Sequence, residues 1–471
     1  MKKTKIICTL GPSSGDAAII KELIKKGMNA ARFNFSHGTH QSHKQLLEAL
    51  REAREELNVP VAAILDTKGP EIRTRNFKNG AVMVGAGNRF SLITGDEPGD
   101  ETKVSTTYPD LYKFVKPKSC ILIDDGLIEL QVSEVRDSEI ECIVVNGGII
   151  GNNKGVNIPD VAIDLPPLTK KDVEDIKFGI ENDFDFIAAS FIRKASDVLA
   201  IRRLLDENDG EKIGIISKIE NREGVESIDE IIEVSDAIMI ARGDLGVEIP
   251  VFEVPVIQKE IIAKCLRNGK PVITATQMLD SMIRNPRPTR AEASDVANAV
   301  FDGTSAVMLS GETASGRYPL ESVAVMADIA KTAENRIDYW LQFRHIETVG
   351  EKTIAYAISH ACCMTAMDLC ASTIITVTKT GHTARMISRF RPQCPIAAVT
   401  SSKKVQRKLS ISWGVSAEHA DEVRSTDELF QIGIEKAKKM KLAAKGDTVV
   451  IAAGVPAGFK GTTNLVKAQI V

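Results

Sequence analysis

The feature that most constrains the fold is a regular alternation of short β-rich runs with amphipathic helical segments along about the first 340 residues. Helical patterns follow the β-rich runs, as at 16–27, 43–58, 170–183, 195–208 and 252–269, and Gly27 reads as a helix C-cap. Strands are predicted at 5–10, 29–36, 61–67, 184–192, 212–221, 236–245, 271–279 and 305–311. Eight strand–helix units favour a (β/α)8 barrel, although the rhythm alone also allows an open doubly wound sheet.

A long interruption follows the third predicted strand. Residues 70–164 contain short alternating runs separated by Gly, Asn and Asp turns. An interval of this length is far beyond an ordinary loop, so we expect a small all-β domain with its own core. The predicted barrel domain is therefore 1–69 together with 165–343. Residues 344–471 show a second α/β pattern, with strands at 372–378, 395–400, 448–454 and 465–471, and are predicted to form a C-terminal domain.

Charge and composition argue against several classes of protein. Lys and Arg total 60 against 63 for Asp and Glu, a net charge of -3, and no long block of one sign occurs. This balance argues against a protein that coats nucleic acid or an anionic membrane. No stretch approaches the roughly 18 apolar residues of a membrane span, and the first apolar run ends at Leu10, too early for a signal peptide. The eight cysteines form no CxxC pair, which predicts free thiols in a reducing cytoplasm.

Polar side chains are concentrated late in the predicted strands, where barrel enzymes carry their chemistry. Within the second and fifth strands they are spaced by two, as one inward-facing row requires. Polar strand ends can also simply pair with one another, but six such ends at once favour a functional site. They are Arg32, Asn34 and Ser36; Asp66 and Thr67, with Lys68, Glu71 and Arg73 just beyond; Lys218 and Glu220; Arg242, Gly243 and Asp244; Thr274, Thr276 and Gln277; and Ser310 and Glu312.

These strand ends offer ligands for a hard divalent cation. Glu220 and Asp244, on neighbouring strands, can share one such ion and leave positions for water or substrate oxygens, as Mg²⁺ prefers. Lys218 adds a mobile positive charge suited to a phosphate or an enolate oxygen. Gly243 allows close approach of a ligand, and the N–H groups around it are suited to a small carboxylate.

A second cluster consists of Asn34, Ser36, Asp66 and Thr67, which are rich in oxygen but carry one negative charge. That composition suits a monovalent cation better than a divalent one. No P-loop, no HRD or DFG kinase motif and no G-x-G-x-x-G after a strand occurs, so any nucleotide binds without those loops.

Longer motifs resemble one family. The chain contains, in order, RFNFSHG, LDTKGPEIRT, NKGVNIP, SFIRK, IISKIEN, IMIARGDLGVEIP, ITATQMLDSMI, NPRPTRAE and DGTSAVMLSGETA. Together they closely resemble the pyruvate kinase family. The resemblance implies a TIM barrel with an inserted small β-barrel lid and a C-terminal α/β domain. It also implies transfer of the phosphoryl group of phosphoenolpyruvate to ADP, giving pyruvate and ATP in the last step of glycolysis, by a cytoplasmic homotetramer that uses Mg²⁺ (or Mn²⁺) and K⁺.

The resemblance also implies roles for single residues. Glu220 and Asp244 would bind the divalent ion, and Lys218 would stabilise the moving phosphoryl group and the enolate. Thr276 would lie near the carbon that is protonated through water. The substrate would be held by Arg32, Lys218, Gly243, Asp244 and Thr276, and phosphates by Arg32, Asn34, Arg73 and Lys154. The potassium ligands would be Asn34, Ser36, Asp66 and Thr67, and Glu71 predicts K⁺ dependence because a lysine there can replace the charge of the cation.

In the C-terminal domain, TKTGHTAR combines hydroxyls, a lysine and free N–H groups at a helix start, as in a phosphate pocket. In the family this loop binds a phosphorylated effector, commonly fructose 1,6-bisphosphate. The predicted effector residues are Thr378, Lys379, Thr380, Gly381, His382 and Thr383. The segment 454–464 lacks the arginine and tryptophan contacts that some members use, so the effector, and whether one binds, stay open.

Two other functions fit part of the sequence. A lyase or aldolase that forms a metal-bound enolate would also use Glu220 and Asp244, but would not explain Lys154 or the monovalent cluster. A non-catalytic metabolite sensor of the same fold would be expected to lose Lys218, Glu220, Asp244 or Thr276, and all four are present.

Overall fold

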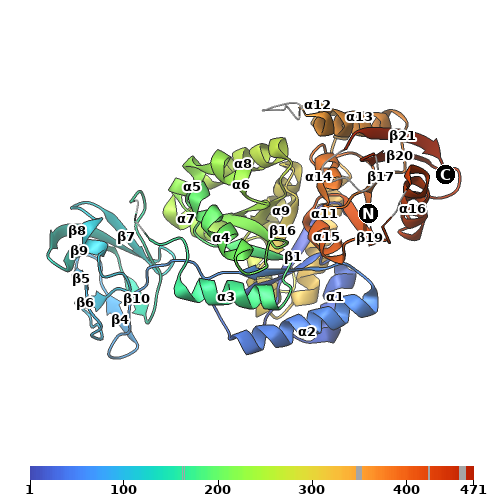
Figure 1. The fold of residues 1–471 in the computed structure, drawn as a ribbon. Helices are drawn as coiled ribbons and strands as arrows, with labels where there is room; N and C mark the ends of the chain where they lie inside the picture. Colours follow the sequence, from blue (N-terminus) through green and yellow to red (C-terminus); the bar gives the residue numbers. More distant parts are fainter. Residues whose placement is uncertain (162, 164, 346–352, 423–424, 456–462) are drawn as a thin grey trace.

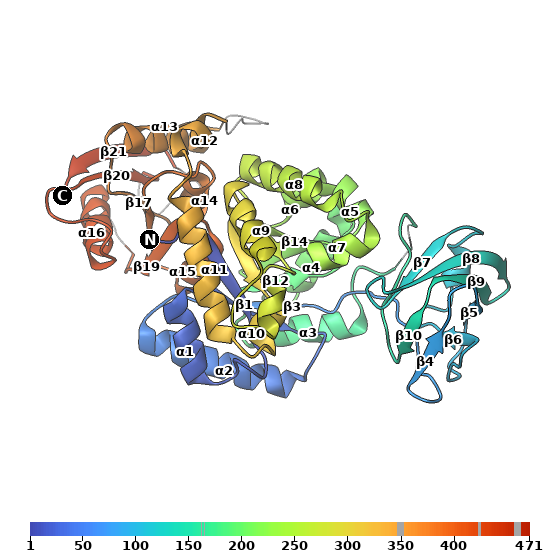
Figure 2. The same cartoon turned by 180° about the vertical axis from the view of Figure 1, so that it is seen from behind.

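The computed structural model describes residues 1–161, 163, 165–345, 353–422, 425–455 and 463–471. Three bodies lie in a row: a β-rich domain at one end, a barrel surrounded by helices in the middle, and an α/β domain at the other end (Figures 1 and 2). The predicted (β/α)8 barrel with an inserted β domain and a C-terminal α/β domain is therefore confirmed.

Parallel strands close the barrel in the order β1-β16-β15-β14-β13-β12-β3-β2. Their residues are buried almost without exception, as expected of a parallel sheet covered on both faces. An apolar cluster to which each of these strands contributes fills the interior, so the barrel is a packed core. The strands are β1 (Lys5–Thr9), β2 (Ala30–Asn34), β3 (Ala62–Asp66), β12 (Phe186–Ala189), β13 (Gly214–Ile219), β14 (Ala237–Ala241), β15 (Val272–Ala275) and β16 (Ala306–Leu309).

The helices around the barrel begin and end where local chemistry predicts. Thr39, Thr169 and Thr289 each form a capping box at the start of a helix. Gly27, with φ 126°, ends α1 and donates its N–H to the carbonyls of Leu23 and Ile24, which confirms the predicted cap. The helices are α1 (Ala17–Lys26), α2 (His40–Leu57), α3 (Lys170–Glu181), α4 (Ala195–Asp206), α5 (Arg222–Glu226), α6 (Ile228–Val234), α7 (Arg242–Glu248), α8 (Val254–Asn268), η2 (Asp280–Ile283), α9 (Arg290–Phe301), α10 (Gly311–Ala314) and α11 (Pro319–Glu334).

The inserted domain leaves the barrel after β3 and returns before α3. It consists of a six-stranded sheet, in the order β11-β7-β8-β9-β5-β6, and a two-stranded sheet, β10-β4, around its own apolar core. Sequence alternation found β4, β5, β7, β8 and β9 but missed β6, β10 and β11. Strands β6 and β11 have only three and two residues, and β10 (GIIG) shows no alternation of polar and apolar residues. The elements are β4 (Ala81–Val84), β5 (Arg89–Ile93), β6 (Lys103–Ser105), η1 (Leu111–Lys113), β7 (Cys120–Ile123), β8 (Ile128–Arg136), β9 (Glu139–Asn146), β10 (Gly148–Gly151) and β11 (Val156–Asn157).

The C-terminal domain has a five-stranded sheet in the order β19-β18-β17-β20-β21, of which β19 was not predicted. Helix α12 spans the predicted boundary at 343/344, and its Tyr339 and Phe343 pack in the C-terminal core. Among the described residues, no helix is long and apolar enough to cross a membrane. The elements are α12 (Tyr339–His345), α13 (Ile354–Asp368), β17 (Thr373–Val377), α14 (His382–Ser388), β18 (Ile396–Thr400), α15 (Lys403–Lys408), η3 (Leu409–Ile411), β19 (Val415–His419), α16 (Thr426–Lys439), β20 (Thr448–Ala453) and β21 (Leu465–Ile470).

Candidate active site

Four of the predicted site residues form a connected set of ion pairs at the carboxyl ends of the barrel strands. Arg32 Nε lies 2.5 Å from Asp66 Oδ2. Lys218 Nζ lies 3.1 Å from Asp66 Oδ1 and 2.9 Å from Glu220 Oε1. The side chains of Asp66 and Glu220 are each 1% exposed, so both carboxylates depend on these cations for compensation. Lys218, near the end of β13, and Glu220, directly after this strand, are therefore part of one buried network.

Burial and neighbouring charge set the protonation of this network. Burial raises the pKa of Glu220 to about 7, and the nearby charge of Asp244 adds to the rise, although Lys218 opposes it. Burial alone would lower the pKa of Lys218, but Asp66 and Glu220 outweigh burial and the pKa is raised. For Asp66, burial would raise the pKa, yet Arg32 and Lys218 together lower it. Lys218 and Asp66 therefore stay charged near neutral pH.

The two carboxylates predicted to hold a divalent ion lie near one another. Asp244 is not at a strand end as predicted, because β14 ends at Ala241 and Asp244 lies in the first turn of α7. Its charge still raises the pKa of Glu220, and a cation between the two groups would relieve that repulsion. Among the described residues, no group of three or more His, Cys, Asp or Glu side chains is placed to hold a metal ion. Mg²⁺ is commonly held by one or two carboxylates together with water or substrate oxygens.

Thr276 holds a strained conformation beside Gly243. Thr276 and the following Gln277 have φ values of 67° and 53°, which are rare for a β-branched residue and mark stored strain. Thr276 Oγ1 accepts a 2.7 Å hydrogen bond from the backbone N–H of Gly243 and donates one of 2.6 Å to the carbonyl of Ala275. The structure thus joins two residues that the sequence placed on separate strands, and the N–H of Gly243 already has a partner.

The oxygen-rich cluster of Asn34, Ser36, Asp66 and Thr67 lies at the ends of two paired strands. Asn34 on β2 is in register with Asp66 on β3. The backbone N–H of Ser36 donates to Asn34 Oδ1 at 3.1 Å, which turns the loop after β2 toward that strand end. The cluster is thus brought together, with Asp66 as the carboxylate it shares with the Arg32–Lys218 network.

A cleft of about 500 Å³ lies between the inserted domain and the barrel. Arg73 and Lys154 line it together with Asp244, so residues of the inserted domain face the candidate cation site. Lys154 Nζ lies 2.9 Å from Asp124 Oδ1, and Arg73 Nη2 lies 2.7 Å from Glu71 Oε2. Glu71 also pairs with Lys68 Nζ at 3.1 Å.

Sequence reasoning missed Ser190 as a site residue. Its Oγ lies 2.7 Å from Lys218 Nζ and 3.4 Å from Asp66 Oδ1, and the side chain is buried. Ser190 directly follows β12, so the strand-end rule that selected the other residues would have found it. Asp125, in the inserted domain, was also missed: it lines the cleft together with Asp244, and burial, followed by the nearby charge of Asp244, raises its pKa.

The predicted effector loop connects β17 to α14. Thr378 Oγ1 accepts from the N–H of Gly381, whose φ of 79° requires glycine-like freedom. Lys379 Nζ lies 2.7 Å from Glu422 Oε1, and Thr383 Oγ1 lies 2.7 Å from Thr463 Oγ1. Thr380 and His382 lie within the same loop and the start of α14. Residues 456–462 of the segment expected to close this loop lie outside the described part of the chain.

The fold and site define a barrel enzyme with buried cations and carboxylates at the strand ends, facing an inserted domain. Residues 1–323 match the family model described as pyruvate kinase, barrel domain, and residues 356–469 match pyruvate kinase, alpha/beta domain. The chain belongs to the pyruvate kinase family and is a phosphotransferase.

Relatives match along the whole chain. A pyruvate kinase of Clostridium acetobutylicum is 54% identical over 100% of both chains. One of Geobacillus stearothermophilus is 50% identical over 100% of this chain and 80% of its own length. A crystal structure of a pyruvate kinase from Cryptosporidium parvum superimposes with a TM-score of 0.95 at 42% identity, covering 100% of this chain and 96% of the other.

Proposed function

We propose that the enzyme transfers the phosphoryl group of phosphoenolpyruvate to ADP, giving pyruvate and ATP as the final step of glycolysis. The observation that carries the proposal is Lys218, whose ammonium group is held between the buried carboxylates of Asp66 and Glu220. A fixed positive charge at this position is suited to the charge that moves during phosphoryl transfer and to the enolate left behind.

Glu220 and Asp244 would hold Mg²⁺ or Mn²⁺, which when bound supplies positive charge to the substrate oxygens. Arg32, Arg73 and Lys154 would orient phosphate groups, with Asn34 beside them, and closure of the lid would exclude water as a competing acceptor. Backbone groups of Gly243 and Asp244, with Thr276, would hold the substrate carboxylate; this requires the Gly243 N–H to leave Thr276 Oγ1. Thr276 would then orient the water that protonates the enolate carbon.

Asn34, Ser36, Asp66 and Thr67 would bind K⁺, with Glu71 adding the negative charge that makes the cation necessary. The test is pyruvate formation from phosphoenolpyruvate and ADP with Mg²⁺, in K⁺ and in a tetraalkylammonium salt. We expect activity in the K⁺ salt and none in the tetraalkylammonium salt. The activity of a Glu71→Lys variant should depend less on K⁺ than that of the parent. Activity in both salts keeps the reaction and rejects the K⁺ site, and absence of activity in both rejects the reaction.

The loop from Thr378 to Thr383 would bind a sugar phosphate as allosteric effector, with Lys379 released from Glu422 to meet the phosphate. Substrate saturation curves with and without fructose 1,6-bisphosphate, for the parent and for Lys379→Glu, test this role. Curves unchanged by the sugar phosphate in both proteins would reject it. From family membership we also infer that the enzyme is a cytoplasmic homotetramer, and light scattering of the purified enzyme tests the tetramer. We infer three domains on the same ground: 1–69 with 165–343, 70–164, and 344–471.

A further inference from the structure

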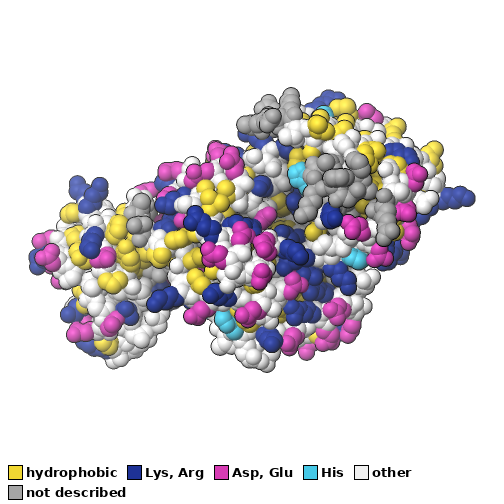
Figure 3. All heavy atoms as spheres, in the orientation of Figure 1, with side chains coloured by type: hydrophobic (Ala, Val, Ile, Leu, Met, Phe, Trp, Pro, Cys, Tyr) yellow, Lys and Arg dark blue, Asp and Glu magenta, His cyan; other side chains and the backbone are white. Residues whose placement is uncertain are grey.

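Positive charge is concentrated where the C-terminal domain meets the amino ends of the barrel strands, the end opposite the candidate active site. Figure 3 shows Lys and Arg side chains gathered along this junction. Lys270 precedes β15, Arg385 lies on α14, and Lys408 ends α15. We call these three residues the seam cations.

Within the described part of the chain, no ion pair joins a carboxylate to a seam cation. Asp236 is the carboxylate that acts on all three, but its Oδ2 is taken by Arg202 at 3.0 Å and by the N–H of Ile215 at 2.8 Å. Among the described residues, the hydrogen-bond partners of the seam cations are backbone carbonyls: those of Glu233 and Ser235 for Lys270, of Thr380 for Arg385, and of Lys212 for Lys408. The junction therefore carries more positive than negative charge.

Unused donors remain on these side chains. An ammonium group has three N–H donors and a guanidinium five, whereas Lys270 uses two and Arg385 one within the described structure. The two groups lie near each other, since both line the same crevice, and each adds to the effect of burial in lowering the pKa of the neighbouring His382. Half-buried cations with free N–H groups are suited to an anion that accepts several hydrogen bonds at once.

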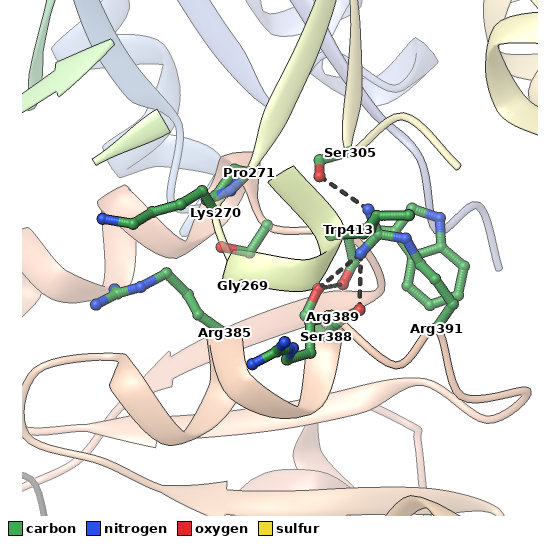
Figure 4. A pocket seen from close by; sticks show the side chains of 11 residues that line it. Gly269, Lys270, Pro271, Ser305, Arg385, Ser388, Arg389, Arg391 and Trp413 are labelled. Carbon is green, nitrogen blue, oxygen red and sulfur yellow. Dashed lines mark hydrogen bonds between the residues drawn. The ribbon is translucent and has the colours of Figure 1, made fainter. Parts of the chain in front are cut away.

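A crevice runs beside these groups. Figure 4 shows Lys270, from the barrel, and Arg385, from the C-terminal domain, extending to the same side of it. Arg389 also lines the crevice, is 7% exposed, and its Nε has no hydrogen-bond partner among the described residues. The enclosed part has room for little more than a water molecule, so a ligand would lie at its mouth with the rest of the molecule in solvent.

We propose that the seam cations form an anion site, separate from both the active site and the effector loop, that binds the phosphate group of inorganic phosphate or of a phosphate ester. Lys270 and Arg385 would supply the principal donors and Lys408 further positive charge. Because Arg385 also donates to the carbonyl of Thr380, a bound phosphate would tie the effector loop to the barrel. Binding should therefore stabilise the junction between the domains.

The test is calorimetric titration of the full chain with inorganic phosphate at constant ionic strength, repeated with glucose 6-phosphate. Lys270→Gln and Arg385→Gln remove one seam cation each, and Arg385→Lys keeps the charge without the planar fork. Lys438→Gln, on the exposed face of α16, is the control that keeps the seam intact, and Lys379→Gln shows whether any of the binding belongs to the effector loop. Circular dichroism confirms that each variant is folded.

We expect saturable binding that each glutamine variant weakens about tenfold, as loss of a charge-assisted hydrogen bond predicts, and Arg385→Lys weakens less. Lys438→Gln should bind within about twofold of the parent, a change near the small effect expected of a distant exposed charge, and saturable binding at the seam should remain in Lys379→Gln. If inorganic phosphate and glucose 6-phosphate bind equally tightly, the site recognises the phosphate group alone. If glucose 6-phosphate binds more tightly, the ligand is a phosphate ester. Binding that survives both glutamine variants, is lost in Lys379→Gln, or does not saturate would overturn the proposal.

Discussion

Replacement of Lys218 by methionine should test the buried network most directly. The substitution keeps most of the side-chain volume and removes the ammonium group that lies 2.9 Å from Glu220 and 3.1 Å from Asp66. The lysine side chain is 9% exposed and both carboxylates 1%, so water cannot replace the lost charge freely. The negative charges of both carboxylates are then compensated by less positive charge than in the parent.

The expected loss of stability follows from which charges remain paired. Removal of one partner from a buried ion pair costs about 3–5 kcal/mol. Arg32 still compensates Asp66, and Glu220 can take up a proton near neutral pH because its pKa is about 7. We therefore expect the lower end, about 3 kcal/mol. Loss of a fixed charge at the reacting group should also lower kcat about 100- to 1000-fold.

Urea unfolding followed by circular dichroism measures the first effect, and a coupled assay of pyruvate formation the second. The matched control is Lys264→Met, which removes an exposed pair with Asp229 at 2.7 Å and should cost no more than about 1 kcal/mol, without loss of kcat. If Lys218→Met unfolds at the same urea concentration as Lys264→Met, the buried network does not stabilise the fold as reasoned here.

Three further substitutions probe other parts of the structure. Ser190→Ala removes the 2.7 Å partner of Lys218 and should lower kcat about tenfold, as one charge-assisted hydrogen bond predicts; steady-state kinetics with kcat within twofold of the parent would contradict this. Arg407→Gln leaves the fully buried Asp185 without its 2.8 Å ion pair and should lower the free energy of unfolding in urea by about 3–5 kcal/mol. The control Lys404→Gln loses an exposed ion pair and should lower it by at most about 1 kcal/mol. Burial lowers the pKa of His43 in the folded protein, so the unfolded chain takes up a proton at a higher pH than the folded chain does. The parent should therefore lose stability as pH falls below about 6.5, by at most about 1.4 kcal/mol per pH unit. His43→Phe should lose less between pH 7 and pH 5, and equal losses would count against this pKa shift.

Local sequence pattern was sufficient for the strands and helices of the barrel and for the positions of its chemistry, although the rhythm alone also allowed an open sheet. Hydrophobic runs and helical periodicity depend on neighbours a few residues apart, so the strands and helices could be placed from the sequence. The strand-end rule then selected Arg32, Lys218 and Glu220, because parallel strands present their carboxyl ends at one face of a barrel. Strand β6 escaped because three residues cannot show a period, and β19 because its sequence VSAEH has one buried residue and no apolar run.

Only the tertiary structure decided which of these groups are partners. Lys218 meets Asp66, 152 positions away in the chain, because the barrel closes with β3, β12 and β13 side by side. The positive φ of Thr276 and the seam between Lys270 and Arg385 likewise depend on contacts between distant segments. The sequence determined the kinds of side chain at the strand ends, whereas barrel closure and domain packing determined their distances, burial and pKa shifts, because those quantities belong to the surroundings of a residue in space.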